Sequence, residues 1–432
     1  MTVATEGRTQ RCPQCGAEVS PDERFAVWCA ACDWNVDPAR PEERHGWLER
    51  AQRAQARRHG ERLFAEMTAD GGPRARRDIA ALLARAVALA VHGLTLALAV
   101  AGVWSLLSGG VPGIVLGLFL LLLAWALRPC PNRLPDDAPV LRRADAPELN
   151  ASVTTYGLRG RRALLLGLPL WEILTPPQRI ALLGHEIGHF GNGDTRHGLI
   201  VGTALRSLTS WRYYFSPTPE PTLVQMAVNL VTLVPGTLVL GVLLLLDRLT
   251  LRAAQRAEYL ADRVAVRAGS AEAAVGLMDR LLVVDSAAVT LRREANGSAK
   301  GARRPAADAA EALWHRLAAD MASIPEHEYE RRRRAGALRG HSVDATHPPT
   351  HLRRASLLTA APAPAAVVMD SGREQRIAAE LADARGRVTQ RILRHGFAAR
   401  HRPWTEGTGP RGRRKAPDHA GTRVLRSRAW PN

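Results

Sequence analysis

The chain has 432 residues, of which 46% are hydrophobic and 5% aromatic, with 59 Lys and Arg against 41 Asp and Glu. At roughly 150 residues per domain this length accommodates two or three domains, and it excludes a mini-protein, a collagen-like fibre and a wholly disordered chain. The net charge of +18 is almost all arginine, since Lys300 and Lys415 are the only lysines. Much of the excess lies in the C-terminal tail and beside apolar segments, so we expect no nucleic-acid partner.

Four of the five cysteines form two Cys-x2-Cys pairs separated by thirteen residues, and these are Cys12, Cys15, Cys29 and Cys32. Two such turns can supply the four thiolates of a tetrahedral structural zinc site. The alternatives are two unrelated pairs of reduced thiols or a redox pair. We predict a zinc-ribbon module here, and because its thiolates must stay reduced, we expect the N-terminus to be cytoplasmic. The polar first 78 residues argue against a signal peptide.

Two uncharged apolar runs, residues 86–107 and 111–127, are long enough to cross a bilayer and are separated by a short turn. Arginines flank the pair on both sides and the turn carries no charge. The positive-inside rule therefore predicts a transmembrane hairpin with both ends in the cytoplasm. A buried helical hairpin of a soluble protein is the alternative. A third apolar run, residues 223–246, is interrupted by Pro235-Gly236.

Several further elements follow from local patterns. The apolar residues 163–168 predict a strand, and Thr175 with two prolines and Gln178 predicts a capped helix that ends near Phe190. Arg331 to Arg334 are interpreted as a solvated charge run. Further helices are expected over residues 41–70, 248–321 with a loop at 296–310, and 373–393.

The sequence His185-Glu186-Ile187-Gly188-His189 lies inside the capped helix. Residues four apart share one face of a helix, so both imidazoles can bind one metal ion. Glu186 lies about a quarter of a turn from His185, where it can accept a proton from metal-activated water but is badly placed as a ligand. The alternative is a hydrogen-bonded histidine pair on a core helix.

A catalytic zinc site needs a third protein ligand and an open fourth position. Asn192 and Thr195 stand where one class of zinc proteases has its glycine and third histidine, which excludes that class. Another class takes a glutamate from a later helix. Glu258 with Asp262 one turn further on fits that pattern, with Asp262 orienting a ligand histidine. Taken alone, this pair is typical of a solvated acidic face.

Three motifs follow one another in the order His185 to Thr195, Glu258 to Asp262, and Thr346-His347-Pro348-Pro349 with Arg353. In this order they resemble the membrane zinc metallopeptidases of family M48. The resemblance spans residues 150–354. It implies a mainly α, polytopic membrane zincin of the gluzincin type with a small β element.

The resemblance also implies roles for individual residues. Zinc would be bound by His185, His189 and Glu258, with Glu186 as general base. His347 and Arg353 match positions that stabilise the oxyanion or hold the substrate. Asn150 and Ala151 match an edge strand to which a substrate peptide adds as a further strand. Ala146-Pro147-Glu148-Leu149 is similar to the start of the family's first soluble helix but runs straight into Asn150, so we expect a shortened wall of the substrate cleft.

His189 and Glu258 must lie on the same side of the bilayer to share one ion, so the chain between them crosses it an even number of times. We expect the apolar run 223–246 to double back at Pro235-Gly236, because Arg206 in the middle of the bilayer would cost ~3 kcal/mol. The alternative is a second crossing by residues 199–210.

The sequence thus predicts a zinc metalloendopeptidase with one catalytic and one structural Zn²⁺, multi-pass in the cell membrane, with its N-terminus and site cytoplasmic. Its expected partners are polypeptides, including membrane proteins under quality control, and the lipid bilayer. An inactive membrane adaptor that retains the zinc-binding fold is the first alternative, and a nucleic-acid-binding regulator is the second. The predicted organisation is a zinc-ribbon module (1–40), a polar helical linker (41–78), a transmembrane hairpin (79–128), a zinc metallopeptidase domain (129–359) with an apolar insertion (199–247), a linker and helix (360–397) and a disordered basic tail (398–432).

Overall fold

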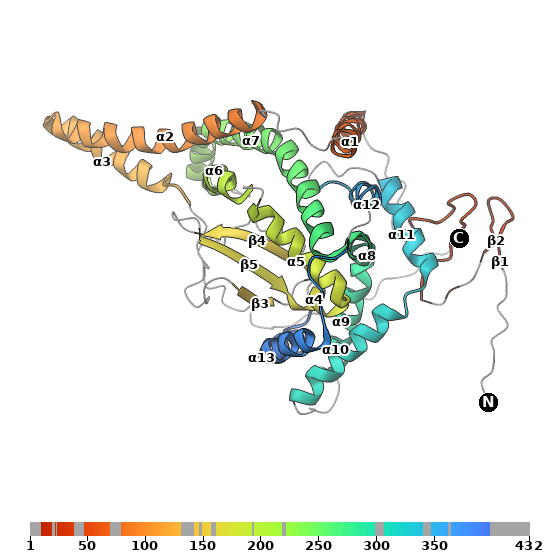
Figure 1. Cartoon of the computed structure of the whole chain (residues 1–432). Helices are drawn as coiled ribbons and strands as arrows, with labels where there is room; N and C mark the ends of the chain where they lie inside the picture. Colours follow the sequence, from red (N-terminus) through yellow and green to blue (C-terminus); the bar gives the residue numbers. More distant parts are fainter. Residues whose placement is uncertain are drawn as a thin grey trace, which may run out of the picture.

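The fold is mainly helical with two small sheets, as expected from the sequence (Figure 1). The computed structural model describes residues 10–19, 22, 24–38, 47–69, 79–130, 142–146, 149–156, 161–191, 194–217, 222–298, 306–339, 347–361 and 364–397. The basic tail predicted over residues 398–432 lies outside the described residues.

The N-terminal unit begins with two short antiparallel strands, β1 (Gln10–Arg11) and β2 (Glu18–Val19), on either side of the first cysteine pair. The second cysteine pair lies in the loop that follows. Helix α1 (Trp47–Thr68) comes next and covers most of the helix expected over residues 41–70. It packs with Leu63 and Met67 against Tyr259 in the body of the protein.

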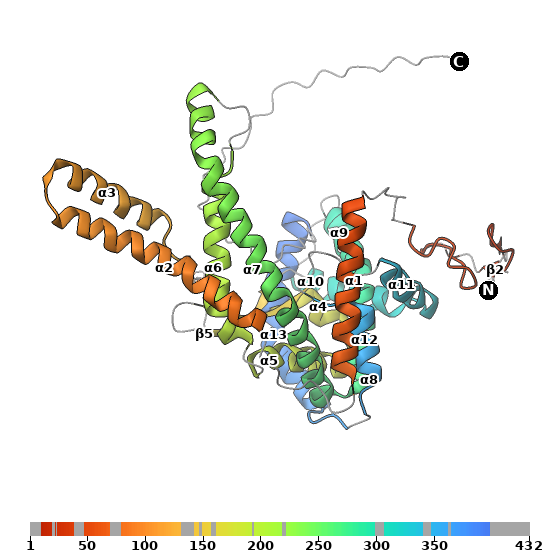
Figure 2. The ribbon, with the colours of Figure 1, turned by 90° about the horizontal axis from the view of Figure 1, so that it is seen from above.

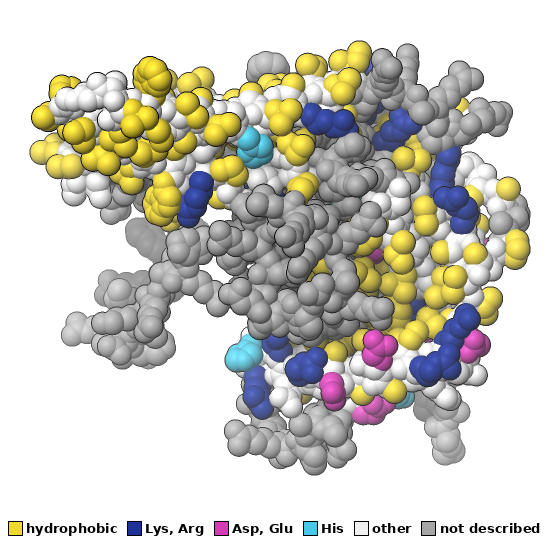
Figure 3. Space-filling view, turned by 60° about the vertical axis from the view of Figure 1, so that its left-hand side comes forward, with side chains coloured by type: hydrophobic (Ala, Val, Ile, Leu, Met, Phe, Trp, Pro, Cys, Tyr) yellow, Lys and Arg dark blue, Asp and Glu magenta, His cyan; other side chains and the backbone are white. Residues whose placement is uncertain are grey.

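Helices α2 (Ile79–Leu107) and α3 (Gly110–Ala126) form the predicted hairpin, which projects from the body (Figure 2). The two helices approach closely at glycines, since a Cβ on Gly117 would lie 2.8 Å from the carbonyl oxygen of Gly102. Large hydrophobic side chains on the hairpin face outward, and Figure 3 shows them gathered over it. Helix α2 is long and apolar enough to cross a membrane.

The apolar run at residues 223–246 does not double back, so that prediction is wrong. It is the first half of one continuous 47-residue helix, α7 (Leu223–Gly269), which passes through Pro235. A proline removes one backbone N–H and bends a helix, whereas a reversal would leave several backbone groups without partners. Helix α7 is also long and apolar enough to cross a membrane, and only 6% of its most apolar stretch is buried.

The apolar half of α7 packs against α2 and against α6 (Asp194–Tyr214), which includes the alternative segment 199–210. Arg206 in α6 is half-buried against protein groups. Its Nε donates to the carbonyl oxygen of Cys130 at 3.1 Å and its Nη2 to Thr203 Oγ1 at 3.4 Å. The free-energy cost expected for Arg206 in the middle of a bilayer applies to an arginine without hydrogen-bond partners. Because Arg206 has such partners, its cost is lower.

The second sheet has the order β3-β5-β4, built from β3 (Arg142–Ala146), β4 (Ala151–Tyr156) and β5 (Arg161–Gly167). Strand β3 runs parallel to β5 and β4 runs antiparallel to it. The strand predicted at 163–168 is confirmed as β5, except that Leu168 already opens α4 (Leu168–Ile173). A helix start at Ala146 is wrong, because β3 ends there and pairs with β5.

Helix α5 (Pro176–Gly191) matches the predicted capped helix. The core lies between α4, α5, the C-terminal half of α7 and the helices that follow, and it includes the fully buried Leu277, Leu291, Leu313 and Trp314. Helix α13 packs along this core and confirms the helix predicted at 373–393. The later helices are α8 (Ala271–Leu282), α9 (Val284–Ser298), α10 (Ala306–Ala322), α11 (Glu326–Arg339), α12 (Thr350–Leu358) and α13 (Ser371–His395).

The arginine run at 331–334 is not a solvated face, so that interpretation is wrong for Arg331. This side chain is only 6% exposed, and its Nε and Nη2 each donate to the buried carboxylate of Glu328 at 2.6 Å. A glutamate three residues before an arginine lies on the same side of a helix, so the two side chains neutralise one another there. Arg331 and Arg334 of this run contact the N-terminal unit, whereas Arg332 and Arg333 pair with carboxylates of the body.

Candidate metal centre

The centre is built where the backbones of α5 and α7 touch. A Cβ on Gly184 would lie 2.7 Å from the Cβ of Ala268, and one on Gly188 would lie 2.9 Å from the Cα of Ala261. A side chain at either glycine would force the helices apart. Because they are glycines, the face of α5 that carries His185 comes directly against the face of α7 that carries Glu258.

The first turn of α5 is stabilised by Thr175 and Gln178, the residues from which the helix start was predicted. The backbone N–H of Thr175 donates to Gln178 Oε1 at 3.1 Å, and the N–H of Arg179 donates to the Thr175 carbonyl oxygen at 2.9 Å. These bonds anchor the first turn next to the sheet. The remainder of the helix then points His185, Glu186 and His189 toward α7 and the sheet.

Three side chains converge with their donor atoms at metal-ligand spacing. His185 Nε2 lies 3.3 Å from His189 Nε2 and 3.4 Å from Glu258 Oε2, and His189 Nε2 lies 3.6 Å from Glu258 Oε1. Ligand atoms about 2.1 Å from one tetrahedral zinc ion are about 3.4 Å apart. The three side chains thus surround a point at which a single ion fits, and they could hold it together.

The surroundings of the Glu258 carboxylate give a second, independent indication that a cation fits at this point. The residue is 5% exposed, and its Oε2 accepts no hydrogen bond, although Arg353 Nη1 lies 3.1 Å away in poor alignment. Burial acts to raise the pKa of Glu258, but Arg353 and the imidazoles of His185 and His347 outweigh it and hold the pKa well below its usual value. A buried, charged carboxylate with an unused oxygen between two imidazoles suits a bound cation.

His185 is oriented from behind by Asp262. Its Nδ1 lies 2.9 Å from Asp262 Oδ1, on the side of the ring opposite Glu258. Burial lowers the pKa of His185, but the adjacent carboxylates of Asp262 and Glu258 prevail and raise it to about 9. The surroundings therefore favour positive charge at this point of the protein, whether a proton or a metal ion supplies it.

Arg353 in α12 binds the carboxylates rather than facing outward. Its Nε and Nη2 donate to the two oxygens of Asp262 at 2.8 and 2.6 Å, a bidentate pair, and its Nη2 lies 3.4 Å from His185 Nδ1. The side chain is buried. All three nitrogens of the guanidinium thus lie beside carboxylate oxygens of Asp262 and Glu258.

Glu186 is the neighbour of His185 and does not join the three ligand side chains. It is 6% exposed. Burial raises its pKa, and the imidazoles of His185 and His189 offset only part of that rise. A carboxyl group whose pKa is raised above its usual value is better suited to accept and return protons than one with an unshifted pKa.

His347 lies at the mouth of the centre, just before the prolines that begin α12. Its Nδ1 is 2.8 Å from Glu258 Oε1, while 65% of the side chain remains exposed. It thus contacts Glu258 and is open to solvent at the same time. The position permits contact with a molecule bound over the site.

Asn150 and Ala151 lie at the start of β4, an outer strand among the described strands. Ala151 pairs with Leu166, and the Asn150 carbonyl oxygen accepts a hydrogen bond from the N–H of Gly167 at 2.8 Å. One side of β4 is therefore used by β5, and β4 packs next to α5. An edge strand beside the metal helix has the geometry that strand addition needs.

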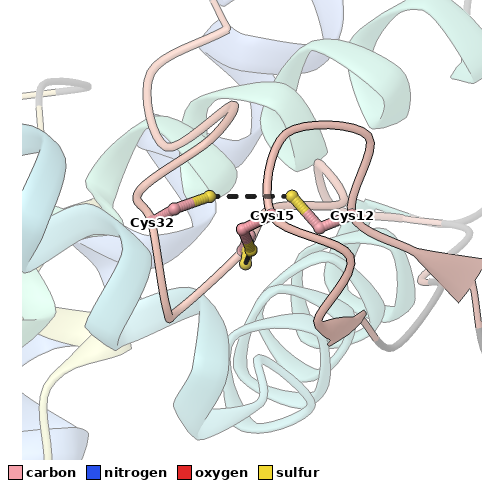
Figure 4. Close-up of side chains that lie close together, drawn as sticks. Cys12, Cys15 and Cys32 are labelled. Carbon is pink, nitrogen blue, oxygen red and sulfur yellow. Dashed lines mark hydrogen bonds between the residues drawn. The ribbon is translucent and has the colours of Figure 1, made fainter.

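The four cysteines of the N-terminal unit also converge. Cys12 Sγ lies 3.6 Å from Cys32 Sγ, and Cys15 Sγ lies 3.5 Å from Cys29 Sγ. These distances are too long for disulfides, while thiolates about 2.3 Å from one tetrahedral zinc ion are about 3.8 Å apart. Figure 4 shows Cys12 and Cys32 reaching toward each other from different loops, with Cys15 beside them. The cluster is suited to one metal ion.

The two cysteine loops repeat one backbone pattern. In the first, the N–H of Gly16 donates to the Cys12 carbonyl oxygen, and in the second the N–H of Asp33 donates to that of Cys29, both at 2.9 Å. Gly16 and Asp33 both have positive φ, 75° and 58°. The glycine was visible in the sequence as a turn residue. Its counterpart Asp33 was not, because aspartate adopts this conformation less often.

Comparison with known protein families gives one match. Residues 132–361 match the model of peptidase family M48. No curated protein and no solved structure matches the chain. The matched range contains α5, α7 and α12, which carry His185, Glu186, His189, Glu258, Asp262 and Arg353, and it also contains His347 just before α12.

The close approach of α5 and α7 leads to a first prediction. We expect Gly188→Val to push the helices apart, to cost about 1–3 kcal/mol of stability through overpacking, and to remove one metal ion per chain. Metal analysis of the purified protein, together with thermal unfolding, measures both effects. Gly191→Ala is the matched control, since no atom lies within 4 Å of a Cβ there. Equal metal content in Gly188→Val and wild type would contradict the proposed contact.

Proposed function

The chain belongs to peptidase family M48, whose model matches more than half of it, and on that premise we propose that it is a membrane-bound zinc endopeptidase acting at the cytoplasmic face. The observation that carries the proposal is the convergence of His185, His189 and Glu258 around one point. We assign these three as ligands of a catalytic zinc ion, and the four cysteines as ligands of a structural one. A bound zinc ion supplies a Lewis acid that acidifies water and polarises a peptide carbonyl.

The protein's own groups then move the proton and stabilise charge. Glu186 accepts a proton from the attacking water and later returns it to the leaving amine, and its burial beside two imidazoles supports that role. His347, exposed at the mouth, donates to the oxyanion of the tetrahedral intermediate. A single well-placed donor of this kind contributes about 3 kcal/mol.

Arg353 and Asp262 act as positioning residues in this proposal. Asp262 fixes the ring of His185 through Nδ1, and Arg353 fixes Asp262 through two parallel hydrogen bonds. Arg353 also stabilises the charge of Glu258. Because the guanidinium is buried among these groups, it acts on the substrate only through them.

The substrate is a polypeptide that binds along β4. A peptide that adds to the outer edge of this strand, starting at Asn150 and Ala151, would lie beside α5 and pass the metal centre. Main-chain hydrogen bonds make such binding largely independent of sequence. That property suits an enzyme that degrades many proteins, and we propose membrane protein quality control as its setting.

We place the protein in a membrane through two helical hairpins, α2 with α3 and α6 with the apolar first half of α7. The length of α2 and α7 and their outward apolar side chains support this placement. Two crossings by α6 and α7 return the chain to the side on which it left, so α5 and Glu258 share the cytoplasmic face. The arginines that flank α2–α3 support the same orientation.

The general-base role is tested by Glu186→Gln. We expect this variant to lose at least about 100-fold in kcat on casein, or in self-cleavage, because the amide cannot accept the proton. Its metal content should equal that of the wild type, since Glu186 is not among the converging ligands. Cleavage assays and metal analysis on the same preparations measure both quantities. If the wild type and the variant are equally inert, the protein is an inactive adaptor instead.

Arg353→Lys tests the positioning role. Lysine keeps the charge but cannot bind Asp262 in a bidentate way, so we expect zinc affinity at the catalytic site to fall about 10–100-fold. Arg316→Lys is the control. Arg316 on α10 donates from Nη2 to Glu294 Oε2 at 2.6 Å, away from the metal centre. Titration against a zinc chelator measures the affinities. An unchanged zinc affinity with a raised KM in Arg353→Lys would instead indicate a substrate-holding role.

Membrane topology is tested with epitope tags in sealed cells. We expect a tag inserted at residues 218–221, between α6 and α7, to be digested by external protease, because those helices cross the membrane. A tag at residues 299–305, between α9 and α10, should be digested only after the membrane is opened. If external protease digests both tags equally in sealed cells, or neither of them, α6 and α7 do not cross the membrane.

A further inference from the structure

The N-terminal four-cysteine unit is docked on the body of the protein through the arginine run of α11. Arg334 Nη1 donates to the Ala30 carbonyl oxygen at 2.6 Å and to Asp33 Oδ1 at 2.9 Å, and its guanidinium stacks 5.2 Å above the ring of Trp28. Arg331 Nη1 donates to the Val36 carbonyl oxygen at 2.8 Å. These arginines therefore bind the unit through two backbone carbonyl oxygens, the carboxylate of Asp33 and the ring of Trp28.

A second group of contacts fastens the same unit to the end of α10 and the start of α11. Arg24 donates to Asp320 at 2.8 Å and to Ser323 at 2.7 Å. Asp22 lies 3.3 Å from His327 Nε2. The docking surface thus has polar contacts at two places, with Trp28 and Val36 packed on Ala335 between them.

The groups that α11 binds are shaped by the second cysteine loop. Ala30 lies between Cys29 and Cys32, and Asp33 follows Cys32 with a positive φ of 58°. The N–H of Asp33 donates to the Cys29 carbonyl oxygen within the loop. A metal ion that ties Cys29 and Cys32 together would stabilise this loop, and with it the carbonyl and carboxylate presented to Arg334.

From α11 a chain of contacts leads to the catalytic centre. Arg333 Nη1 lies 3.4 Å from Asp279 Oδ1 on α8, and the same carboxylate accepts from Arg354 Nε on α12 at 2.8 Å. The residue just before Arg354 in α12 is Arg353, which binds Asp262 and Glu258. On its other side α12 is touched by α1, which continues from the cysteine unit (Figure 2). Helix α12 is therefore in contact with α1, which follows the cysteine unit in the chain, and with α11, on which the unit docks.

We propose that the four-cysteine unit is a metal-dependent intramolecular clamp whose docking surface is α11 and which keeps α12 and Arg353 in place at the catalytic centre. With its ion bound, the unit stays docked and α12 is ordered. Without it, the loop at Cys29–Cys32 relaxes, Arg331 and Arg334 lose their contacts with the cysteine unit, and α12 loosens. The inference rests on the proposed function for its consequence in catalysis, and not for the docking itself.

Backbone hydrogen exchange of the full-length protein in detergent tests the clamp. The background is Glu186→Gln, so that self-cleavage does not interfere. We expect the double variant Cys29→Ser, Cys32→Ser to bind one zinc ion fewer and to exchange about tenfold faster in both α11 and α12. Exchange in α13, which packs on α9, α10 and β3, should not change.

A variant on the α11 side of the interface separates loss of docking from misfolding of the cysteine loop, because it leaves the cysteines intact. Arg334→Gln should raise exchange in α11 and α12 in the same way while keeping both zinc ions. Its control is Arg332→Gln, because both arginines pair with a glutamate four residues earlier, but Arg332 binds Glu328 and Asp285 and not the cysteine unit. We expect exchange in Arg332→Gln to match the background.

Two outcomes would overturn the clamp: unchanged exchange in the cysteine variant despite loss of its metal, or faster exchange in α11 without any change in α12. Neither depends on catalysis. If the Glu186-intact protein cleaves no substrate while the exchange pattern is as expected, the clamp stands and the peptidase proposal fails. If that protein is active and the cysteine substitutions alter neither exchange nor activity, the clamp fails and the peptidase proposal stands.

Discussion

The metal centre depends on how the protein compensates a buried carboxylate. Glu258 has three imidazoles and a guanidinium close to it, and one of its oxygens still accepts no hydrogen bond. A charge in such a place is tolerated only if opposite charges surround it. Arg353 supplies one, and a bound cation would supply the rest. The centre is therefore incomplete without α12, although α12 lies far along the chain from both metal-binding helices.

The second constraint is the backbone contact between α5 and α7. Small residues on both helices let the axes approach so closely that the His185 face and the Glu258 face meet. The apolar insertion leaves the domain as α6 and returns as the first half of α7, which then runs on without a break to Glu258. The metal ligand is thus attached to the same rigid helix as the proposed membrane segment. A tilt of α7 in the bilayer would move Glu258 relative to α5.

Several arginines of this protein are buried or partly buried and hold other groups in place through hydrogen bonds. Arg353 joins two carboxylates, Arg331 neutralises Glu328 beneath the cysteine unit, and Arg334 binds that unit's backbone. A planar guanidinium can make several hydrogen bonds in fixed directions, so it can be buried where lysine could not. The large positive charge of the chain is therefore partly structural, and its meaning cannot be inferred from composition alone.

The sequence by itself determined the elements whose pattern is local. The spacing of His185 and His189, the cap at Thr175, the β5 strand, the apolar hairpin and the two Cys-x2-Cys turns all follow from residues within a few positions of one another, and the helices and strand among them form where expected. Only the tertiary structure decided the rest. Arg331 is buried because a distant unit lies on it, α7 packs against α6 instead of folding back on itself, and Arg353 faces Asp262 because α12 packs on α7. Those outcomes depend on contacts between residues far apart in the chain, and no periodicity or propensity within one segment contains that information.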